Sequence, residues 1–250
     1  MKKLTGVWLG TRAYRPTLEF MRELFEARRA EEIDDVVLFI EHEPVVTLGS
    51  GAKLENLLAS PEVFEKLGID VVETGRGGDV TLHAPGQLVC YPIVNLAPDR
   101  CDVRKYVQGL TDVMGRIVAP FGVETGTIPG KIGLWTDRER LSEWRGVEHA
   151  ELPVKIGAIG VRISRWITQH GFALNLTTNL ELFQLIVPCG IREFGVSSLL
   201  DLTGHAESPR TAAERALPLL AQSLGRETDG LDEANGVDFD ELLTRLRARG

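Results

Sequence analysis

Cys189 is the residue of this chain whose type and surroundings best suit covalent chemistry. It lies between Pro188, which fixes the approach of the backbone, and Gly190, which leaves space beside the sulfur. A thiolate is the best nucleophile among side chains, and a nearby positive charge increases its fraction at neutral pH. Most isolated cysteines are small buried hydrophobic residues, so a core role stays open for Cys189 on this context alone.

The other two cysteines are weaker candidates for a nucleophile. Cys90 lies inside the apolar run 88–94, which predicts a core position, and Cys101 precedes Asp102 at the start of an expected helix. The three cysteines form no CxxC pair and lack metal-ligand spacing with the five histidines. We therefore expect no metal site.

Lys155 heads a run of apolar and small residues from Ile156 to Val161. An ammonium group at the start of a buried strand is partly desolvated, which makes it a candidate proton carrier. The alternative is a lysine at the end of a strand whose side chain reaches solvent. The residue by itself does not decide between the two.

The segment from Arg76 to Gln87 is the richest in glycine and short polar residues. Paired glycines let the backbone approach a ligand closely and expose amide donors, and an arginine beside them suits a carbonyl or an anion. A glycine-rich hairpin with a histidine in its turn explains the same residues without a ligand. Both interpretations stay open at this point.

Charge and hydropathy exclude several classes of protein. The chain has 250 residues and a formal net charge of −8, whereas nucleic-acid binding requires a basic footprint, so we expect no nucleic-acid partner. No stretch approaches the roughly 20 apolar residues of a membrane span, and no signal segment follows the basic start. A chain of this length with only three cysteines suits a reducing compartment. We expect a cytoplasmic protein with no membrane partner.

Helices and strands that look antiparallel alternate irregularly, which predicts an α+β fold in a single domain, with a mixed sheet flanked by helices. One domain is expected over residues 1–224, followed by an acidic linker and a C-terminal helix over 225–250. The expected strands are 6–10, 35–41 (covered on both faces), 69–73, 88–96, 132–136, 154–163 and 171–176, and the expected helices are 17–29, 61–67, 102–119, 210–224 and 239–247.

Five blocks of this sequence, taken in order, resemble the lipoyl(octanoyl) transferase family. They are Glu41–Gly49, Arg76–Gln87, Lys155–Arg162, His170–Asn175 and Pro188–Gly190. The separation between Lys155 and Cys189 also matches that family. Lys131 begins a second Lys-Ile-Gly tripeptide but lacks the small residues that follow Lys155.

The resemblance implies the catalytic core shared with lipoate and biotin protein ligases, with residues 1–224 as the octanoyltransferase catalytic domain. It implies that Cys189 carries an acyl thioester, that Lys155 favours the thiolate and shuttles protons, and that no cofactor is needed. It also implies a substrate pocket lined by Arg76, Gly77, Gly78, Asp79, Val80, Thr81, Leu82, His83, Ala158, Ile159, Gly160, Gly171, Phe172 and Ala173.

The partners implied by the resemblance are octanoyl-acyl carrier protein as donor and apo lipoyl domains as acceptors. These acceptors belong to 2-oxoacid dehydrogenase complexes and to the glycine cleavage H protein. Two rival functions remain. An ATP-dependent lipoate- or biotin-protein ligase on the same fold would form an acyl-adenylate and needs no cysteine, and a non-catalytic module would bind acyl groups or carrier proteins.

Three features depart from the family pattern. Leu82 stands where a tyrosine is usual, and its missing hydroxyl is expected to alter the rim of the pocket. Ala84 stands where a glycine is usual, so a positive φ at this position would be strained. The link from Thr136 to Leu152 is longer than usual, which predicts a surface insertion.

Overall fold

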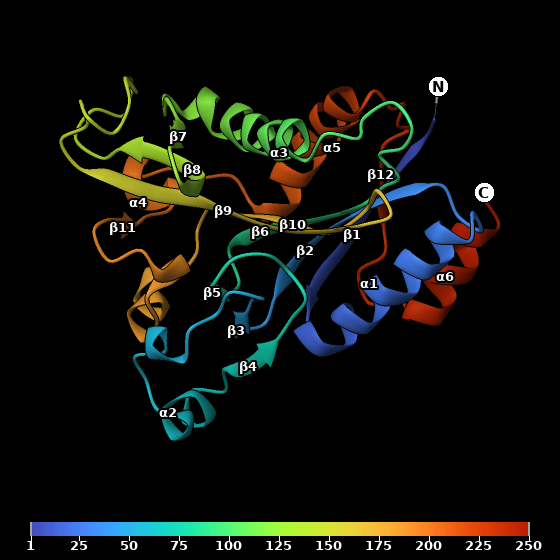
Figure 1. Cartoon of the computed structure of the whole chain (residues 1–250), viewed down its shortest axis with the longest axis horizontal. Helices are drawn as coiled ribbons and strands as arrows, with labels where there is room; N and C mark the ends of the chain where they lie inside the picture. Colours follow the sequence, from blue (N-terminus) through green and yellow to red (C-terminus); the bar gives the residue numbers. More distant parts are fainter. Residues whose placement is uncertain (1, 250) are drawn as a thin grey trace.

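A nine-stranded mixed sheet runs through the middle of the protein (Figure 1). The structure, a computed structural model, describes residues 2–249. Along the sheet the strands follow the order β12-β1-β2-β6-β10-β9-β8-β7, and β11 pairs with β9. Their bounds are β1 (Leu4–Arg12), β2 (Asp35–His42), β6 (Gln87–Ile93), β7 (Gly126–Ile128), β8 (Lys131–Asp137), β9 (Pro153–Ser164), β10 (Ile167–Asn175), β11 (Gly195–Val196) and β12 (Leu231–Glu233). Strands β12, β1 and β2 are parallel, and β2, β6, β10, β9, β8 and β7 pair antiparallel.

Helices cover both faces of the large sheet. Helices α3 (Val103–Val118) and α5 (Pro209–Leu224) pack on one face, and α1 (Tyr14–Arg29) and α6 (Phe239–Arg247) on the other. Strand β2 shows why its sequence is apolar without interruption. Val37 and Phe39 enter the first core, and Val36, Leu38 and Ile40 the second. The prediction of a strand buried on both faces is confirmed.

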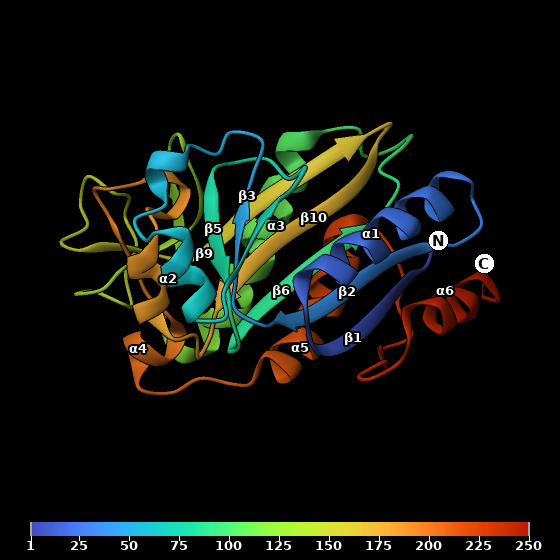
Figure 2. The ribbon, with the colours of Figure 1, turned by 90° about the horizontal axis from the view of Figure 1, so that it is seen from below.

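A second, three-stranded sheet lies below the large one in the view of Figure 1 and in front of it in Figure 2, which is seen from below. Its order is β4-β3-β5, and it has its own apolar core with α2. The bounds of these elements are β3 (Val45–Leu48), β4 (Asp70–Glu73), β5 (Val80–His83) and α2 (Pro61–Lys66), and a short helix α4 (Leu199–Thr203) precedes α5. Short 3₁₀ turns form at Leu54–Asn56, Ala119–Phe121, Leu180–Leu185 and Pro188–Gly190.

The predicted class, α+β with a mixed sheet flanked by helices, is confirmed. The predicted helix 239–247 has the bounds of α6, and the other predicted helices differ by a few residues at their ends. Part of the glycine-rich segment, Val80–His83, forms β5 and pairs with β3. Among residues 2–249, no helix is both long and apolar enough to cross a membrane.

The segment expected as an acidic linker, 225–236, instead contains a strand. β12 pairs with β1, with Gly6 opposite Leu231 and Trp8 opposite Glu233. Arg226 also forms a buried ion pair with Asp35 (2.6 Å), whose other oxygen binds Arg28 (2.7 Å). An acidic, glycine-containing composition predicts a mobile segment. Here the buried Asp35 carboxylate and pairing with the edge strand β1 hold the segment in place. The division of the chain at residue 224 stays a prediction.

Candidate active site

The structure brings Lys155 and Cys189 into direct contact. Lys155 lies near the start of β9 with 5% of its surface exposed, and its Nζ is 3.1 Å from the Cys189 sulfur. The ring of Trp135, from the neighbouring strand β8, lies 5.5 Å from the same Nζ. The Lys155 ammonium group therefore lies against both the sulfur and an aromatic face. The alternative of a lysine reaching into solvent is excluded by its burial.

Gly133 on β8 makes room for the Lys155 side chain. A Cβ at this glycine would lie 2.3 Å from Lys155 Cε and 2.6 Å from the Gly157 carbonyl oxygen, and its φ is +145°. Such distances are far below van der Waals contact, so any side chain here would displace the lysine or the strand. The position of the ammonium therefore depends on the absence of a side chain one strand away.

The backbone of the Cys189 turn is left-handed at two successive residues. Cys189 has φ 56° and ψ 20°, and Gly190 has φ 67°. This conformation costs a residue other than glycine about 1–2 kcal/mol, so surrounding contacts must maintain it. The Gly190 amide donates to the Val187 carbonyl (3.1 Å), and the Val187 amide donates to the Asn56 carbonyl (2.8 Å).

Asp79 fastens this turn to the glycine-rich segment. Its carboxylate accepts hydrogen bonds from the Asn56 side-chain amide (2.6 Å) and from the backbone amides of Lys53 (3.0 Å) and Val80 (2.8 Å). A Cβ at Gly190 would lie 2.7 Å from Asp79 Oδ2, so the carboxylate lies directly against the turn. Asp79 lines the cavity, but its oxygens already have partners within the protein.

Arg76 is a buried cation in the wall of the same cavity. Its guanidinium donates to the Thr47 carbonyl (2.5 Å), the Thr47 hydroxyl (2.9 Å and 3.0 Å) and the Gly77 carbonyl (3.1 Å), all of them neutral oxygens. Burial lowers the pKa of Arg76, and its neighbours Tyr14 and Cys189 oppose that shift. A cation that is hydrogen-bonded only to neutral groups leaves its charge available to an anion in the cavity.

The cavity beside Cys189 has a volume of about 450 Å³ including its open mouth. Strands β9 and β10 supply one wall, where Ala158 pairs with Ala173, Ile159 with Phe172 and Gly160 with Gly171. Small residues on paired strands leave a space suited to an apolar ligand. Of the predicted pocket residues, those that line the cavity are Arg76, Gly78, Asp79, Thr81, His83, Ala158, Ile159, Gly160, Gly171, Phe172 and Ala173.

Three predicted pocket residues, Gly77, Val80 and Leu82, are absent from the cavity wall among the residues described. Side chains alternate along β5, so Thr81 and His83 face the cavity while Val80 and Leu82 enter the core of the small sheet. The expectation that Leu82 alters the pocket rim is therefore wrong. Ala84 has no positive φ, so the strain considered for it does not arise.

The predicted insertion between Thr136 and Leu152 forms turns that connect β8 to β9. Asp137 ties the two ends together by accepting backbone hydrogen bonds from Glu139, Glu151 and Leu152 (3.1, 2.9 and 3.0 Å). These bonds lower the pKa of Asp137 against the effect of its burial. Within the described part of the chain, this link contributes nothing to the cavity wall.

The other two cysteines, Cys90 and Cys101, lie outside the cavity wall. Cys90 is fully buried in the core, as expected, and burial raises the pKa of its thiol. Cys101 is exposed just before α3 and does not line the cavity. Cys189 is thus the cysteine, among residues 2–249, that faces the cavity.

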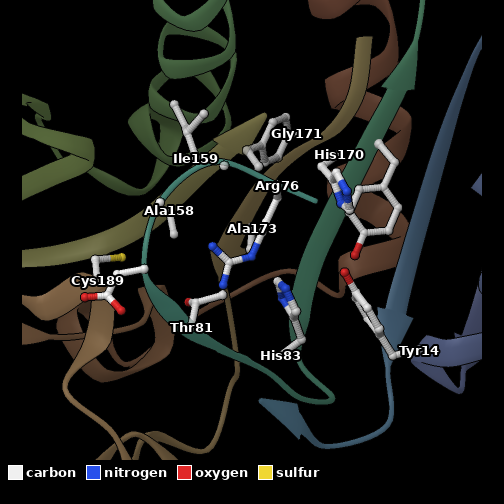
Figure 3. A pocket seen from close by; sticks show the side chains of 15 residues that line it. Tyr14, Arg76, Thr81, His83, Ala158, Ile159, His170, Gly171, Ala173 and Cys189 are labelled. Carbon is white, nitrogen blue, oxygen red and sulfur yellow. The ribbon is translucent and has the colours of Figure 1, made fainter. Parts of the chain in front are cut away.

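The predicted pocket left out three residues of the cavity wall, Tyr14, Tyr91 and His170. Figure 3 labels Tyr14 and His170. Tyr14 begins α1, Tyr91 lies within an apolar strand, and His170 has a φ of 57° within β10. An unusual backbone at a histidine often marks a functional position, but the sequence does not reveal φ. Tyr91 carries no local signal because a tyrosine in an apolar run is ordinary core, and Tyr14 is a single aromatic residue at the start of a helix.

Burial makes the histidines of this region resist protonation. It lowers the pKa of His42 to about 4 and that of His83 and His170 to about 3. His42 Nδ1 donates to the Arg12 carbonyl (3.0 Å), and His83 Nδ1 contacts Gln87 Oε1 (2.7 Å), which suits neutral rings. At neutral pH this side of the cavity is therefore polar and uncharged.

These depressed pKa values predict that the protein loses stability in mild acid. Below about pH 6.5 the unfolded chain binds protons that the folded protein does not, so the free energy of unfolding falls as the pH falls. At pH 5 each of the three histidines would lower it by about 2 kcal/mol relative to pH 7.5. Urea unfolding at pH 5 and at pH 7.5 measures this difference in the free energy of unfolding. The exposed His205 provides the control, since His205→Asn should keep the full difference. Equal stability at both pH values would contradict the prediction.

Comparison with known proteins places this chain and its fold in a class. The family model of the lipoyl protein ligase A/B catalytic domain matches residues 13–220. An archaeal bipartite lipoate protein ligase from Thermoplasma acidophilum superimposes with a TM-score of 0.68 at 13% identity, covering 99% of this chain and 93% of that one. A lipoate-protein ligase A bound with ATP gives 0.63 at 15% identity, covering 99% and 94%. These likenesses show a shared fold.

The relatives by sequence are more specific. An octanoyltransferase from Myxococcus xanthus is 46% identical over 87% of this chain, and the match spans 58% of that protein's length. Octanoyltransferases from Acidobacterium capsulatum and Chloroflexus aurantiacus are 42% and 38% identical and cover 87% and 91% of this chain, with 87% and 96% of their own lengths matched. The chain therefore belongs to the lipoyl(octanoyl) transferase family and is an acyltransferase.

Proposed function

We propose that the protein transfers an octanoyl group from octanoyl-acyl carrier protein to a lysine of an apo lipoyl domain, through a thioester on Cys189. The observation that carries the proposal is the 3.1 Å contact between Lys155 Nζ and the Cys189 sulfur at a cavity walled by small and apolar residues. A nucleophile, its charge partner and a space for an acyl chain meet at one place.

In the first step the Cys189 thiolate attacks the carbonyl carbon of the donor thioester. The bond from that carbon to the carrier's sulfur breaks, the Lys155 ammonium gives a proton to that sulfur, and the carrier leaves as a free thiol. Lys155 is then a neutral amine. One thioester replaces another, so the step is nearly isoenergetic and needs no ATP. Burial of the chain at about 0.8 kcal/mol per methylene gives about 5 kcal/mol for holding a medium-chain acyl group.

In the second step the amine of the acceptor lysine attacks the acyl-enzyme. The amine loses a proton, the carbon–sulfur bond to Cys189 breaks, and a stable amide forms. Lys155 is the base nearest the reacting sulfur and carries that proton. The amides of Gly77 and Gly190 already donate to Val161 and Val187, so the charge of Arg76 is the better candidate to stabilise the oxyanion.

The acceptors expected are lipoyl domains of 2-oxoacid dehydrogenase complexes and the glycine cleavage H protein. One fold neighbour is a bipartite lipoate protein ligase that is described alongside its E2 lipoyl domain. An acceptor of this type supplies the exposed lysine that the second step requires.

Omission of ATP tests the proposal against the rival ligase activity. We expect purified enzyme mixed with octanoyl-acyl carrier protein to gain one octanoyl mass without ATP, and to pass it to an added apo lipoyl domain. Intact-mass spectrometry detects both products. Free octanoate with ATP serves as the control and should give none. Transfer that requires free acid and ATP would instead identify an adenylate-forming ligase.

A further inference from the structure

One buried aromatic ring, that of Trp135, contacts both the lysine of the site and the loop that carries the cysteine. Trp135 lies on β8 and is 0% exposed. Its ring lies 5.5 Å from Lys155 Nζ. On another side it meets the ring of Phe194 edge to face, with 5.4 Å between the ring centroids. Phe194 belongs to the loop that runs from Cys189 to β11, so the indole links the two members of the pair.

A β-bulge directs Trp135 and Lys155 toward each other. Trp135 is opposite Lys155 on the paired strands β8 and β9. The preceding residue, Leu134, is opposite Gly157, so Ile156 is an extra residue on β9 between the two pairs. Residues directly opposite each other on antiparallel strands have their side chains on the same face of the sheet. The bulge therefore places the indole and the ammonium group on one face, and bulges that re-aim side chains are frequent beside active sites.

Two further contacts fix the orientation of the indole. Trp135 Nε1 donates a hydrogen bond to the Lys131 carbonyl (3.0 Å). Lys131 Nζ lies 5.5 Å from the Phe194 ring and 3.0 Å from Glu193 Oε1. The Glu193 side chain is 62% exposed, so this ion pair by itself adds little. The packing of Phe194 against Lys131 and Trp135 is the firmer link between β8 and the cysteine loop.

We propose that Trp135 is a positioning residue that holds the Lys155 ammonium group against the Cys189 sulfur. A lysine side chain has many rotamers, and holding one of them costs conformational entropy. Attraction between the ammonium group and the indole face favours the rotamer that reaches the sulfur, and such attraction is strongest where both groups are buried. Among residues 2–249, Trp135 is absent from the cavity wall, so it acts through the lysine. Its effect on the reaction rests on the function proposed above.

Substitutions that keep or remove the aromatic ring test this role. We expect Trp135→Leu to slow the loading of Cys189 about tenfold at saturating octanoyl-acyl carrier protein, because the lysine loses the ring that holds it. Trp135→Phe keeps an aromatic face and should stay within about threefold of the wild-type rate. The donor concentration that gives half-maximal loading should be unchanged in both variants. Equal rates in the two variants, or a loss seen only in the half-maximal concentration, would overturn the proposal.

Trp8→Leu is the matched control for the loss of a buried tryptophan. Trp8 is 6% exposed and lies on β1, which β2, β6 and β10 separate from β9. The substitution should lower the free energy of unfolding in urea without slowing the loading at saturating donor. If it slows loading as much as Trp135→Leu does, general destabilisation explains the effect and the proposal fails. Should Trp135→Leu not fold, Trp135→Met replaces it with the same expected loss, since methionine fills irregular space in a core.

A chemical probe measures the geometry without the reaction. o-Phthalaldehyde joins an amine and a thiol into a fluorescent isoindole only where the two groups are adjacent. Cys101→Ser serves as the parent protein, because it removes the exposed thiol. We expect the parent to form the isoindole, Trp135→Leu in that parent to form it about tenfold more slowly, and Lys155→Ala to form none. No isoindole in the parent, or equal rates with and without the ring, would overturn the proposal.

These two measurements separate the positioning role from the proposed function. If isoindole formation depends on the ring but the protein gains no octanoyl mass, only the proposed function is wrong. If octanoyl loads at the same rate with and without the ring, only the positioning role of Trp135 is wrong.

Discussion

Cys189→Ser will abolish the acyl-enzyme, with loading by octanoyl-acyl carrier protein falling at least about a thousandfold. The serine hydroxyl keeps the size of the side chain, but it does not ionise beside an ammonium as a thiol does. Lys155 would then face a neutral oxygen in place of a thiolate, and the first bond would not form. Intact-mass spectrometry of enzyme and carrier, sampled over time, measures the loading directly.

Cys101→Ser is the control for this substitution, because Cys101 is exposed and does not line the cavity. It should load at the wild-type rate. A serine variant at position 189 that still gains an octanoyl mass on a thiol would refute the assignment of the nucleophile. The left-handed backbone of Cys189 is shared by both side chains, so a folding defect is not expected.

Lys155→Ala should lower overall transfer at neutral pH by about 10²- to 10⁴-fold. It removes the ammonium group that contacts the sulfur and the base that takes the acceptor's proton, so both half-reactions slow down. Single-turnover measurements of loading by octanoyl-acyl carrier protein, and of transfer from preloaded enzyme to the lipoyl domain, give the loss in each half-reaction.

Displacement of the lysine tests the same claim without removing its charge. Gly133→Ala puts a methyl group 2.3 Å from Lys155 Cε and should reduce loading although the ammonium remains. Gly130→Ala is the matched control, since Gly130 also has a positive φ (+77°) on the same hairpin but no atom lies within 4 Å of its Cβ position. Undiminished turnover in Lys155→Ala at neutral pH would rule out the catalytic lysine. Equal losses in the two glycine variants would attribute the effect to backbone strain.

The sequence by itself determined the local elements and the residues of greatest chemical promise. The strand at Asp35–His42 follows from an unbroken apolar run, and the helix at Phe239–Arg247 follows from side chains spaced to bury one face. The resemblance of five ordered blocks to the transferase family, and not the residues alone, implied Lys155 and Cys189 as a pair and the glycine-rich segment as part of a pocket. These signals are local, or they are repeated in order along the chain, so they can be read without coordinates.

Tertiary structure decided what those residues contact. The side-chain direction of Leu82 depends on which face of β5 meets the cavity. The strand at Leu231–Glu233 forms because the edge of β1 is available for pairing and because the buried Asp35 binds the neighbouring Arg226. Tyr14 and His170 come from elements more than half the chain apart and share one cavity only because α1 packs on β10. Such contacts arise from packing between distant segments, and no periodicity within either segment records them.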